Sequence, residues 1–272
     1  MKKSDLKLHL VMVPWALLWL APLWLMAVYA TLPDTAIFSS TARLLPGGDL
    51  MANLRALQAD TDFARAFFNS VAVSVIYTAL ALLVTSMVGY AFACYRFRGN
   101  GLLFAGVLAT LTVPWFVLAI PQYILVARDL HLTNTWAAII VPALASSLGV
   151  FFMRQTFLSL HPALLDAARV DGAGETRIFF RVALPLVRPS LAALGLILFL
   201  ASWNDYLWPL LVLNEKEMYT APVALGTLIG LTRVSWGAIM AGALVMTTPL
   251  LVLFMLLQRH FLAGISAGAV KD

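Results

Sequence analysis

Six runs of about twenty mostly apolar residues constrain this chain more than any other feature of its sequence. A helix of that length crosses the hydrocarbon core of a bilayer, whereas a strand of a membrane barrel needs only about ten residues of alternating polarity. Helices and closed barrels are the structures that satisfy their backbone hydrogen bonds within lipid, so the long runs predict helices. The predicted spans lie near residues 10–31, 66–95, 102–127, 135–154, 190–213 and 236–258.

The composition supports an all-α, polytopic membrane protein with a single transmembrane domain over residues 1–272. With 62% apolar residues, 11% charged residues and a mean hydropathy of +0.90, the chain has too little polar surface for a soluble globule. The first thirty residues also have the basic start and apolar core of a secretory signal. Their apolar run is longer than the roughly 7–15 residues of a signal core, which favours a retained first helix.

Internal prolines interrupt the third, fourth and sixth predicted spans. They are Pro114, Pro121, Pro142 and Pro249. Each frees a backbone carbonyl and can bend its helix. Bent helices suit a moving pathway, although membrane helices also tolerate proline without any such role.

The net charge of +5 indicates membrane orientation rather than binding to nucleic acid. Six spans place both termini on one side of the membrane. With the termini in the cytoplasm, twelve Lys and Arg residues lie in inner segments and six in outer segments, which are Arg43, Arg55, Arg65, Arg128, Lys216 and Arg233. This asymmetry predicts a multi-pass protein of the cytoplasmic (inner) membrane with both termini cytoplasmic. It also places the loop at about 155–189 in the cytoplasm.

That cytoplasmic loop is a polar segment with two helical halves. Pro162 suits the first turn of a helix and Gly172 suits a left-handed end, so we expect a helix of about ten residues between them. Leu164, Ala167 and Ala168 then share one face. A helix so short is marginal in water and needs tertiary packing or a docked partner. These residues alone fit either a docking element or an interfacial helix in the headgroup layer.

The order of short motifs in this loop resembles the coupling loop of ATP-driven import permeases. The motifs are Asp166-Ala167-Ala168, Asp171-Gly172-Ala173 and Val182-x-Leu184-Pro185. Nearly the whole chain is similar to the maltose-type carbohydrate import permeases through further pieces: Asn69-Ser70, Tyr90-Ala91-Phe92-Ala93, Arg96-Phe97-Arg98-Gly99, Ser202-Trp203-Asn204-Asp205 and a tail from Gln258-Arg259 to Val270-Lys271. Two positions depart from the family pattern. Asp166 stands where a longer Glu is usual, and Glu175 follows Gly174 where a small hydroxyl residue is common.

The resemblance implies a permease subunit of a type I, binding-protein-dependent ABC importer with six transmembrane helices, moving a sugar or related polyol. The implied partners are a second permease subunit, two cytoplasmic ATPase subunits, an extracytoplasmic solute-binding protein, the sugar and membrane lipid, without nucleic acid. The implied ATPase-docking residues are Asp166, Ala167, Ala168, Asp171, Gly172, Ala173, Leu184 and Pro185. Since the chain lacks a G-x-x-x-x-G-K-[ST] motif, we expect it to bind no cofactor and partner subunits to hydrolyse the ATP.

The fifth span contains the candidate substrate path. Asp205 lies about fifteen residues into this span, roughly 22 Å along a helix, and an ionisable group there is a functional hypothesis by default. Trp203, Asn204 and Tyr206 beside it offer the ring faces and hydrogen bonds that bind sugars. Trp203 and Tyr206, with Trp208, equally fit an aromatic belt that anchors the helix at the membrane interface.

Other polar residues give weaker indications. Gln122, Ser146 and Ser147 fit helix packing as well as a pathway. The four histidines, His9, His131, His161 and His260, lack metal-ligand spacing, and neither acids nor histidines cluster as they would in a membrane enzyme. The remaining rival is an ion-coupled secondary transporter, which typically has repeated halves and several intramembrane charges. ATP dependence of uptake separates that rival from an ABC permease.

Overall fold

The structure is a computed structural model that describes residues 3–38, 43–230 and 234–269, with side chains described for 8–38, 43–230 and 234–255. Every regular element in these ranges is helical, which confirms the all-α prediction. Arg233 of the charge count and Val270-Lys271 of the tail motif lie outside the described residues. The chain divides into two compact units, residues 1–67 with 221–251 and residues 68–220 with 252–272. Helices α4 and α15 contribute residues to both units, and the single-domain prediction stays a prediction.

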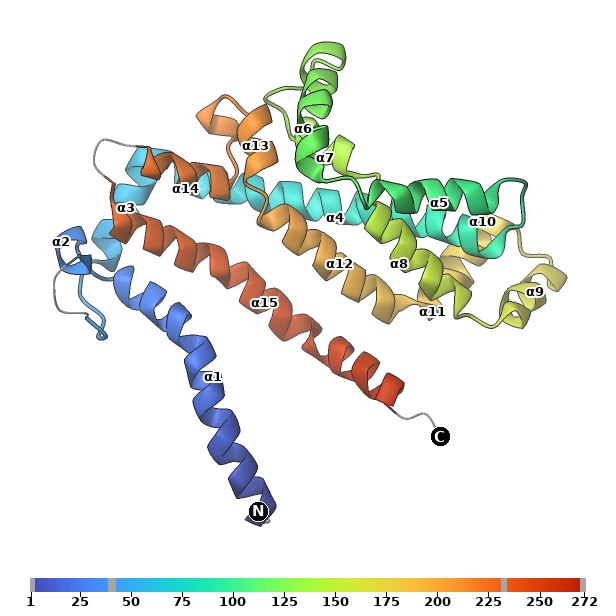
Figure 1. Cartoon of the computed structure of the whole chain (residues 1–272), viewed down its shortest axis with the longest axis horizontal. Coiled ribbons are helices and arrows are strands. Elements are labelled where there is room, and N and C mark those ends of the chain that lie inside the picture. Colours follow the sequence, from blue (N-terminus) through green and yellow to red (C-terminus); the bar gives the residue numbers. More distant parts are fainter. Residues whose placement is uncertain (1–2, 39–42, 231–233, 270–272) are drawn as a thin grey trace. The chain divides into compact units, whose positions relative to one another are not determined.

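The first unit contains the first predicted span and the segment at 32–65 that follows it. Its helices are α1 (Lys3–Tyr29), α2 (Asp34–Ile37), α3 (Leu50–Thr61), α14 (Ala221–Ile229) and the first part of α15 (Trp236–Ala269), all labelled in Figure 1. Asn53 on α3 is buried, and its amide donates 2.9 Å hydrogen bonds to the carbonyl oxygens of Ala30 and Leu32. These bonds hold α3 against the end of α1, so the segment that follows α1 is ordered locally by a buried polar side chain.

Helix α1 presents a nearly unbroken apolar surface. Only 6% of its most apolar spanning window is buried within the chain. Trp15, Trp19 and Trp24 are each more than half exposed. A helix that is apolar on all sides and has so few neighbours within its own chain is stable in a hydrocarbon environment rather than in water.

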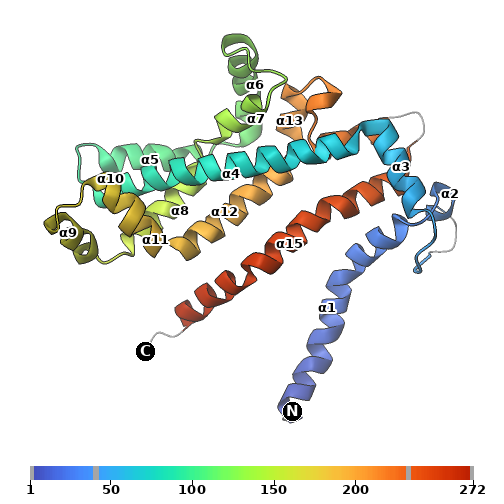
Figure 2. The same ribbon diagram turned by 180° about the vertical axis from the view of Figure 1, so that it is seen from behind.

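The second unit is built along α4 (Phe63–Cys94), which Figure 2 shows in cyan. Its other helices are α5 (Asn100–Thr110), α6 (Trp115–Ile124), α7 (Trp136–Ala143), α8 (Ser147–Leu158), α9 (Pro162–Val170), α10 (Glu175–Ile178), α11 (Leu184–Leu186), α12 (Arg188–Trp203) and α13 (Leu207–Val212). Two π-helical turns, Leu125–Asp129 and Phe179–Ala183, and a 3₁₀ turn, Lys216–Met218, complete the unit. Its apolar core joins α4, α7, α8, α12 and α13.

Glycines allow α4, α8 and α12 to approach closely. A Cβ atom added at Gly89 of α4 would lie 2.7 Å from Met153 Cβ on α8, and one at Gly149 of α8 would lie 2.7 Å from Thr85 Cγ2 on α4. At Gly195 of α12 an added Cβ would lie 3.2 Å from Leu82 Cδ1. Close packing through small residues is the usual way in which membrane helices associate, because lipid offers them no hydrophobic driving force.

The six predicted spans all coincide with helices, and three of them are bent or broken. Helices α1, α4 and α15 are continuous, whereas α5 and α6 meet at 98° and α7 and α8 meet at 45°. The predicted fifth span coincides with α12 and α13, which are separated at Asn204–Tyr206. With 16 residues, or about 24 Å, α12 is too short to cross a bilayer of about 30 Å alone. It turns by 83° from the preceding α10–α11 segment.

Prolines explain where the helices break. Val113, just before Pro114, is disfavoured in helical conformation, and α6 begins after that proline. Pro142 lies near the end of α7, while Pro249 is accommodated within the continuous α15. Pro209 was not considered in the sequence analysis. Its ring would clash with the carbonyl of Asp205 in a continuous helix, so the chain leaves helical geometry there.

We predict that Gly89→Val destabilises the second unit, because the added side chain meets Met153 Cβ and the Arg154 backbone nitrogen. Both atoms are fixed by the backbone of α8 and cannot move aside as a flexible side chain could. Overpacking of this kind costs roughly 1–3 kcal/mol. The measurement is the thermal unfolding midpoint of the purified complex. Gly101→Val on α5 is the matched control, since an added Cβ there meets no heavy atom within 4 Å. Equal midpoints for the two variants would contradict the close packing of α4 and α8.

Candidate functional site

The loop that the sequence singled out folds as the predicted short helix with a glycine end. Helix α9 begins at Pro162, and the Nδ1 atom of His161 accepts a 3.3 Å hydrogen bond from the Ala163 amide. Gly172 has φ +79°, the left-handed conformation that glycine adopts without strain. The Ala173 amide donates to the Ala168 carbonyl and the Gly172 amide to the Arg169 carbonyl, both at 3.0 Å. These two bonds form a Schellman ending, which satisfies the last carbonyls of α9.

One face of α9 is apolar and exposed. Leu165 is buried against the core of the unit, while Leu164 and Val170 on the other side are 49% and 87% exposed. Ala167 lies between them and is also exposed, whereas Ala168 is half-buried. The predicted shared face therefore holds for Leu164 and Ala167 but not for Ala168, which packs inward. An exposed Leu–Ala–Val surface on a short helix is suited to contact with another protein.

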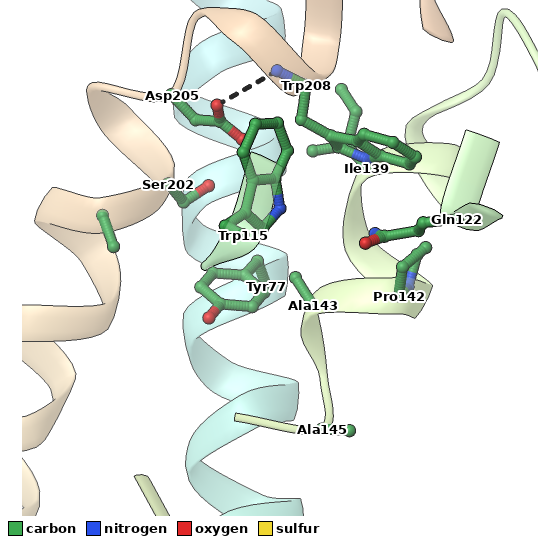
Figure 3. Close-up of a pocket in the computed structure, with 11 residues that line it drawn as sticks. Tyr77, Trp115, Gln122, Ile139, Pro142, Ala143, Ala145, Ser202, Asp205 and Trp208 are labelled. Atoms are coloured by element: carbon green, nitrogen blue, oxygen red, sulfur yellow. Dashed lines mark hydrogen bonds between the residues drawn. The ribbon is translucent and has the colours of Figure 1, made fainter. Parts of the chain in front are cut away.

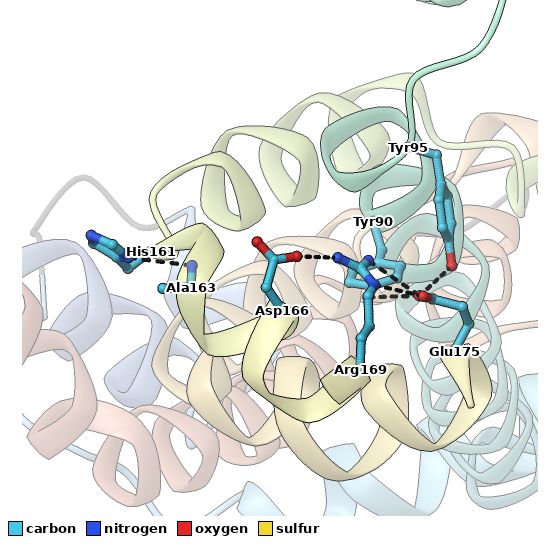
Figure 4. A network of polar contacts seen from close by, with 7 residues as sticks. All are labelled: Tyr90, Tyr95, His161, Ala163, Asp166, Arg169 and Glu175. Carbon is cyan, nitrogen blue, oxygen red and sulfur yellow. Dashed lines mark hydrogen bonds and ion pairs between the residues drawn. The ribbon is translucent and has the colours of Figure 1, made fainter. Parts of the chain in front are cut away.

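A charged network ties α9 to the segment that follows it and to the end of α4 (Figure 4). The Arg169 guanidinium donates to Asp166 Oδ1 at 2.7 Å and to Glu175 Oε1 at 2.8 Å. The Tyr95 hydroxyl donates to Glu175 Oε2 at 2.8 Å. The hydrogen bonds from Arg169 and Tyr95 hold the pKa of the Glu175 carboxyl below its ordinary value. The carboxylate therefore stays charged, and the network stays intact, when the pH falls somewhat below the usual range for Glu.

Aromatic packing around Tyr90 also stabilises the position of this network. Tyr90 of α4 packs edge-on against Phe157 of α8, with ring centroids 5.3 Å apart, and lies 5.2 Å from the ring of Phe179. Its hydroxyl is 3.5 Å from Glu175 Oε2. Ile178 and Phe179 are both buried. The segment from α9 to α11 is thus packed onto the ends of α4 and α8 as one piece.

The predicted docking residues occupy different environments in this segment. The Asp166 side chain is 65% exposed and pairs with Arg169, and Asp171 caps the end of α9. Ala173 and Leu184 pack against the core of the unit, and Pro185 is half-buried. Asp166, Ala167 and Asp171 therefore remain accessible to a partner. The other residues of the set shape the loop, and docking by the set stays a prediction.

A cavity of about 260 Å³ lies where the broken helices converge (Figure 3). Its polar lining comes from Tyr77 on α4, Gln122 on α6, Ser202 on α12 and Asp205 in the break before α13. Trp115, Trp208, Ile139 and Pro142 supply apolar walls, together with Ala143, Ala145 and Ala201. In Figure 3, Asp205 and Ser202 approach from one side and Gln122 from the other, with the Trp115 ring between them in this view.

The helix breaks around this cavity are held by hydrogen bonds to freed backbone groups. Pro142 has no amide proton to donate to the Ala138 carbonyl, and the buried indole N–H of Trp208 donates to that oxygen instead, at 2.9 Å. The Asn134 amide nitrogen donates to the Val212 carbonyl at 2.7 Å. Its side-chain oxygen accepts from the Glu215 amide at 3.1 Å. These bonds join α7 to α13 and fix the cavity wall.

The four predicted path residues do not share one environment. Asp205 lines the cavity, and its Oδ1 atom accepts a 3.4 Å hydrogen bond from the Trp208 amide. Trp203 is 1% exposed and stacks on Phe199, with ring centroids 5.6 Å apart. The side-chain amide of Asn204 donates to the Leu200 carbonyl at 2.9 Å. Asn204 and Tyr206 are exposed beside the cavity rather than lining it.

Sequence reasoning missed several residues of both sites. It noted Glu175 only as a departure from the family pattern, although Glu175 is the acceptor at the centre of the loop network. It did not single out Tyr77 or Trp115, because aromatic residues in apolar spans give no signal that separates lining from packing. Pro209, four residues after Asp205, was the available sign that the helix breaks at the acid.

A family model described as "Binding-protein-dependent transport system inner membrane component" matches residues 86–267. The arabinooligosaccharides transport system permease protein of Halalkalibacterium halodurans is 43% identical over 205 residues, covering 75% of this chain and 73% of that protein. The lactose transport system permease protein of Rhizobium radiobacter is 36% identical, covering 83% of this chain and 82% of that protein. The sn-glycerol-3-phosphate transport system permease protein of Yersinia pestis is 32% identical, covering 96% and 95%.

Among solved structures, the chain is similar to one from a bacterial ABC transporter involved in the import of the acidic polysaccharide alginate. The TM-score is 0.79, and the alignment covers 96% of this chain and 99% of that chain at 20% identity. Likeness at this level of identity shows a shared fold, and it confirms the expected permease architecture.

We predict that Glu175→Ala loosens α9, because it removes the acceptor shared by Arg169 and Tyr95. The Glu175 side chain is 43% exposed, so we discount the network to roughly 1 kcal/mol for solvent screening. Backbone amides of α9 are then expected to exchange hydrogen about fivefold faster in the purified complex. Arg177→Ala, at an exposed position two residues away, is the control and leaves α9 unchanged. Unaltered exchange in Glu175→Ala would show that aromatic packing alone fixes the loop.

Proposed function

The chain belongs to the family of binding-protein-dependent transport system inner membrane components, and from that premise we propose that it forms one half of an ATP-driven import pore for a sugar or related polyol. It is a multi-pass inner membrane permease that works within an ABC transporter complex. The proposed partners are a second permease subunit, two cytoplasmic ATPase subunits and an extracytoplasmic solute-binding protein. In this proposal the chain catalyses no reaction, and both of its termini lie in the cytoplasm.

The main support for the proposal is the exposed apolar face of α9, a helix that is fixed to its own unit by an ion-pair network and aromatic packing. Leu164, Ala167 and Val170 face away from the chain, while Arg169 and Glu175 lock the helix to its own unit. A nine-residue helix cannot keep such order by itself in water. The charged network and the aromatic packing keep α9 ordered. A partner that binds the exposed face and shifts it would therefore move the whole segment from α9 to α11.

The ATPase subunits are the proposed occupants of this face. The positive-inside asymmetry of the sequence supports a cytoplasmic position for α9. The chain has no phosphate-cradling motif of its own, so ATP is bound and hydrolysed by the partners in this proposal. We assign Leu164, Val170, Asp166, Ala167 and Asp171 to direct contact. We assign Ala168, Gly172, Ala173, Leu184 and Pro185 to the shape of the loop.

The cavity at the helix breaks is the proposed part of the substrate path in this subunit. It combines aromatic faces with a few polar groups, which is the usual composition of small-molecule sites. Of the residues that the sequence suggested for the path, Asp205 and the weaker candidate Gln122 line this cavity. Trp203, Asn204 and Tyr206 support the break that positions Asp205.

The first expected outcome is ATP-dependent uptake by the reconstituted complex of both permeases, both ATPases and the binding protein. Proteoliposomes are loaded with ATP on the ATPase side and supplied with labelled arabinotriose or lactose. We expect accumulation that requires hydrolysable ATP and survives collapse of ion gradients by ionophores. Uptake driven by an ion gradient without ATP would instead establish a secondary transporter.

The second prediction concerns Gly172 as the end of the docking helix. Gly172→Ala places a Cβ in a left-handed backbone, which costs about 1 kcal/mol and disturbs the α9 ending, although no heavy atom lies within 4 Å. We expect substrate-stimulated ATPase activity and uptake to fall together, several-fold, with the complex still assembled.

Gly174→Ala is the matched control for this experiment. Gly174 has φ −68°, and an added Cβ there also meets no heavy atom within 4 Å. The control is expected to retain wild-type coupling. Equal coupling in Gly172→Ala, Gly174→Ala and the wild type would contradict a role for the helix ending in transmission.

A further inference from the structure

The cavity that contains Asp205 has an acidic lining without cationic side chains. Asp205 is the charged side chain among the eleven lining residues, which include no Lys, Arg or His. All of these lining residues belong to the second unit. Resting on the proposed function, we propose that this cavity accepts one uncharged sugar ring and excludes anionic sugars and phosphates, with Asp205 as the residue that sets the charge selectivity.

The Asp205 carboxylate has acceptor capacity to spare. A carboxylate accepts about four hydrogen bonds. The Trp208 amide at 3.4 Å is the sole hydrogen bond to the Asp205 side chain recorded in the described part of the chain. Neighbouring hydroxyl groups of a sugar are donors that match the remaining lone pairs. Ser202 and Gln122 present further polar atoms to the same cavity.

The apolar walls suit the carbon face of a ring. The rings of Trp115 and Trp208 are perpendicular, with centroids 6.3 Å apart, and Tyr77 lines the cavity from α4. Aromatic faces beside a few convergent polar groups are the arrangement that binds a ligand with one apolar face and polar edges. The cavity volume is close to the lower limit of about 300 Å³ for small-molecule pockets, which suits a single ring rather than a chain of rings.

The lining of the cavity is unfavourable for an anionic ligand. A phosphate or uronate carboxylate finds no cationic side chain among the lining residues and comes within a few ångströms of the Asp205 carboxylate. Like charges at that distance repel strongly where the walls exclude much of the water. The inference therefore favours substrates such as those named for the arabinooligosaccharide and lactose permeases over sn-glycerol-3-phosphate, which is named for a relative that matches more of this chain.

The variant Asp205→Asn separates this role from a structural one. Asp205 also accepts from the Trp208 amide at the start of α13, in the manner of a helix cap. Asn has the same shape and caps as well as Asp, so the substitution removes the charge and keeps the break. Asp129→Asn, at an exposed position that does not line the cavity, is the matched control.

The test compares two methyl glycosides, methyl galactopyranoside and methyl galactopyranosiduronate, which differ only in that a carboxylate replaces the C6 hydroxymethyl group in the second. The complete complex in nanodiscs, without binding protein, is titrated with each probe at equal ionic strength, and tryptophan fluorescence reports binding through Trp115 and Trp208. We expect the wild type to bind the neutral probe at least tenfold more tightly, a difference of about 1.4 kcal/mol. Asp205→Asn is expected to narrow the ratio to threefold or less, Asp129→Asn to leave it unchanged, and Trp115→Phe to reduce the signal.

Three results would overturn the inference: no binding of the neutral probe, equal binding of both probes to the wild type, or an unchanged ratio in Asp205→Asn. None of them bears on ATP-dependent uptake, which the proteoliposome experiment measures separately. An importer that carries sn-glycerol-3-phosphate and binds both probes alike would keep the proposed function and reject the charge selectivity.

Discussion

Backbone hydrogen bonding within lipid is the constraint on which the rest of this structure depends. A peptide group without a partner in hydrocarbon costs several kcal/mol, so a spanning helix can break only where the freed groups find other partners. Here the partners are side chains and backbone groups of neighbouring broken helices. Trp208 satisfies the carbonyl that Pro142 leaves free, and Asn134 bridges to the end of α13. The cavity thus lies beside a pair of broken segments, α7 and α13, whose backbone groups are satisfied across the break, and α6 lines another part of its wall.

The sequence was sufficient for features that depend on local chemistry. The lengths of the apolar runs located all six spans, and Pro162 and Gly172 located both ends of α9 within a residue, because capping and left-handed geometry are set by the residues themselves.

Features that depend on distant partners were not predictable from the sequence. Trp203 was expected beside Asp205 on the path, but it is the last residue of α12 and is 1% exposed, buried by residues that a local pattern does not identify. Glu175 acquires its importance from Tyr95, which lies 80 positions away in the sequence. Similarly, Asn69, one of the motif residues, donates to the carbonyls of Glu217 and Tyr219 and so fixes the start of α4 to a distant loop. Such pairings are tertiary, and no local pattern encodes them.

The exposed surface of α1 has a consequence for how the protein is made. Because so little of this helix is buried within its own chain, its residence in the bilayer depends on its own transfer free energy rather than on contacts formed later. Helix α1 precedes the discontinuous helices in the chain, so it is able to insert alone before those helices, which need one another, are synthesised. Membrane insertion of α1 and the packing of the discontinuous helices are thus separate steps in the biogenesis of this chain.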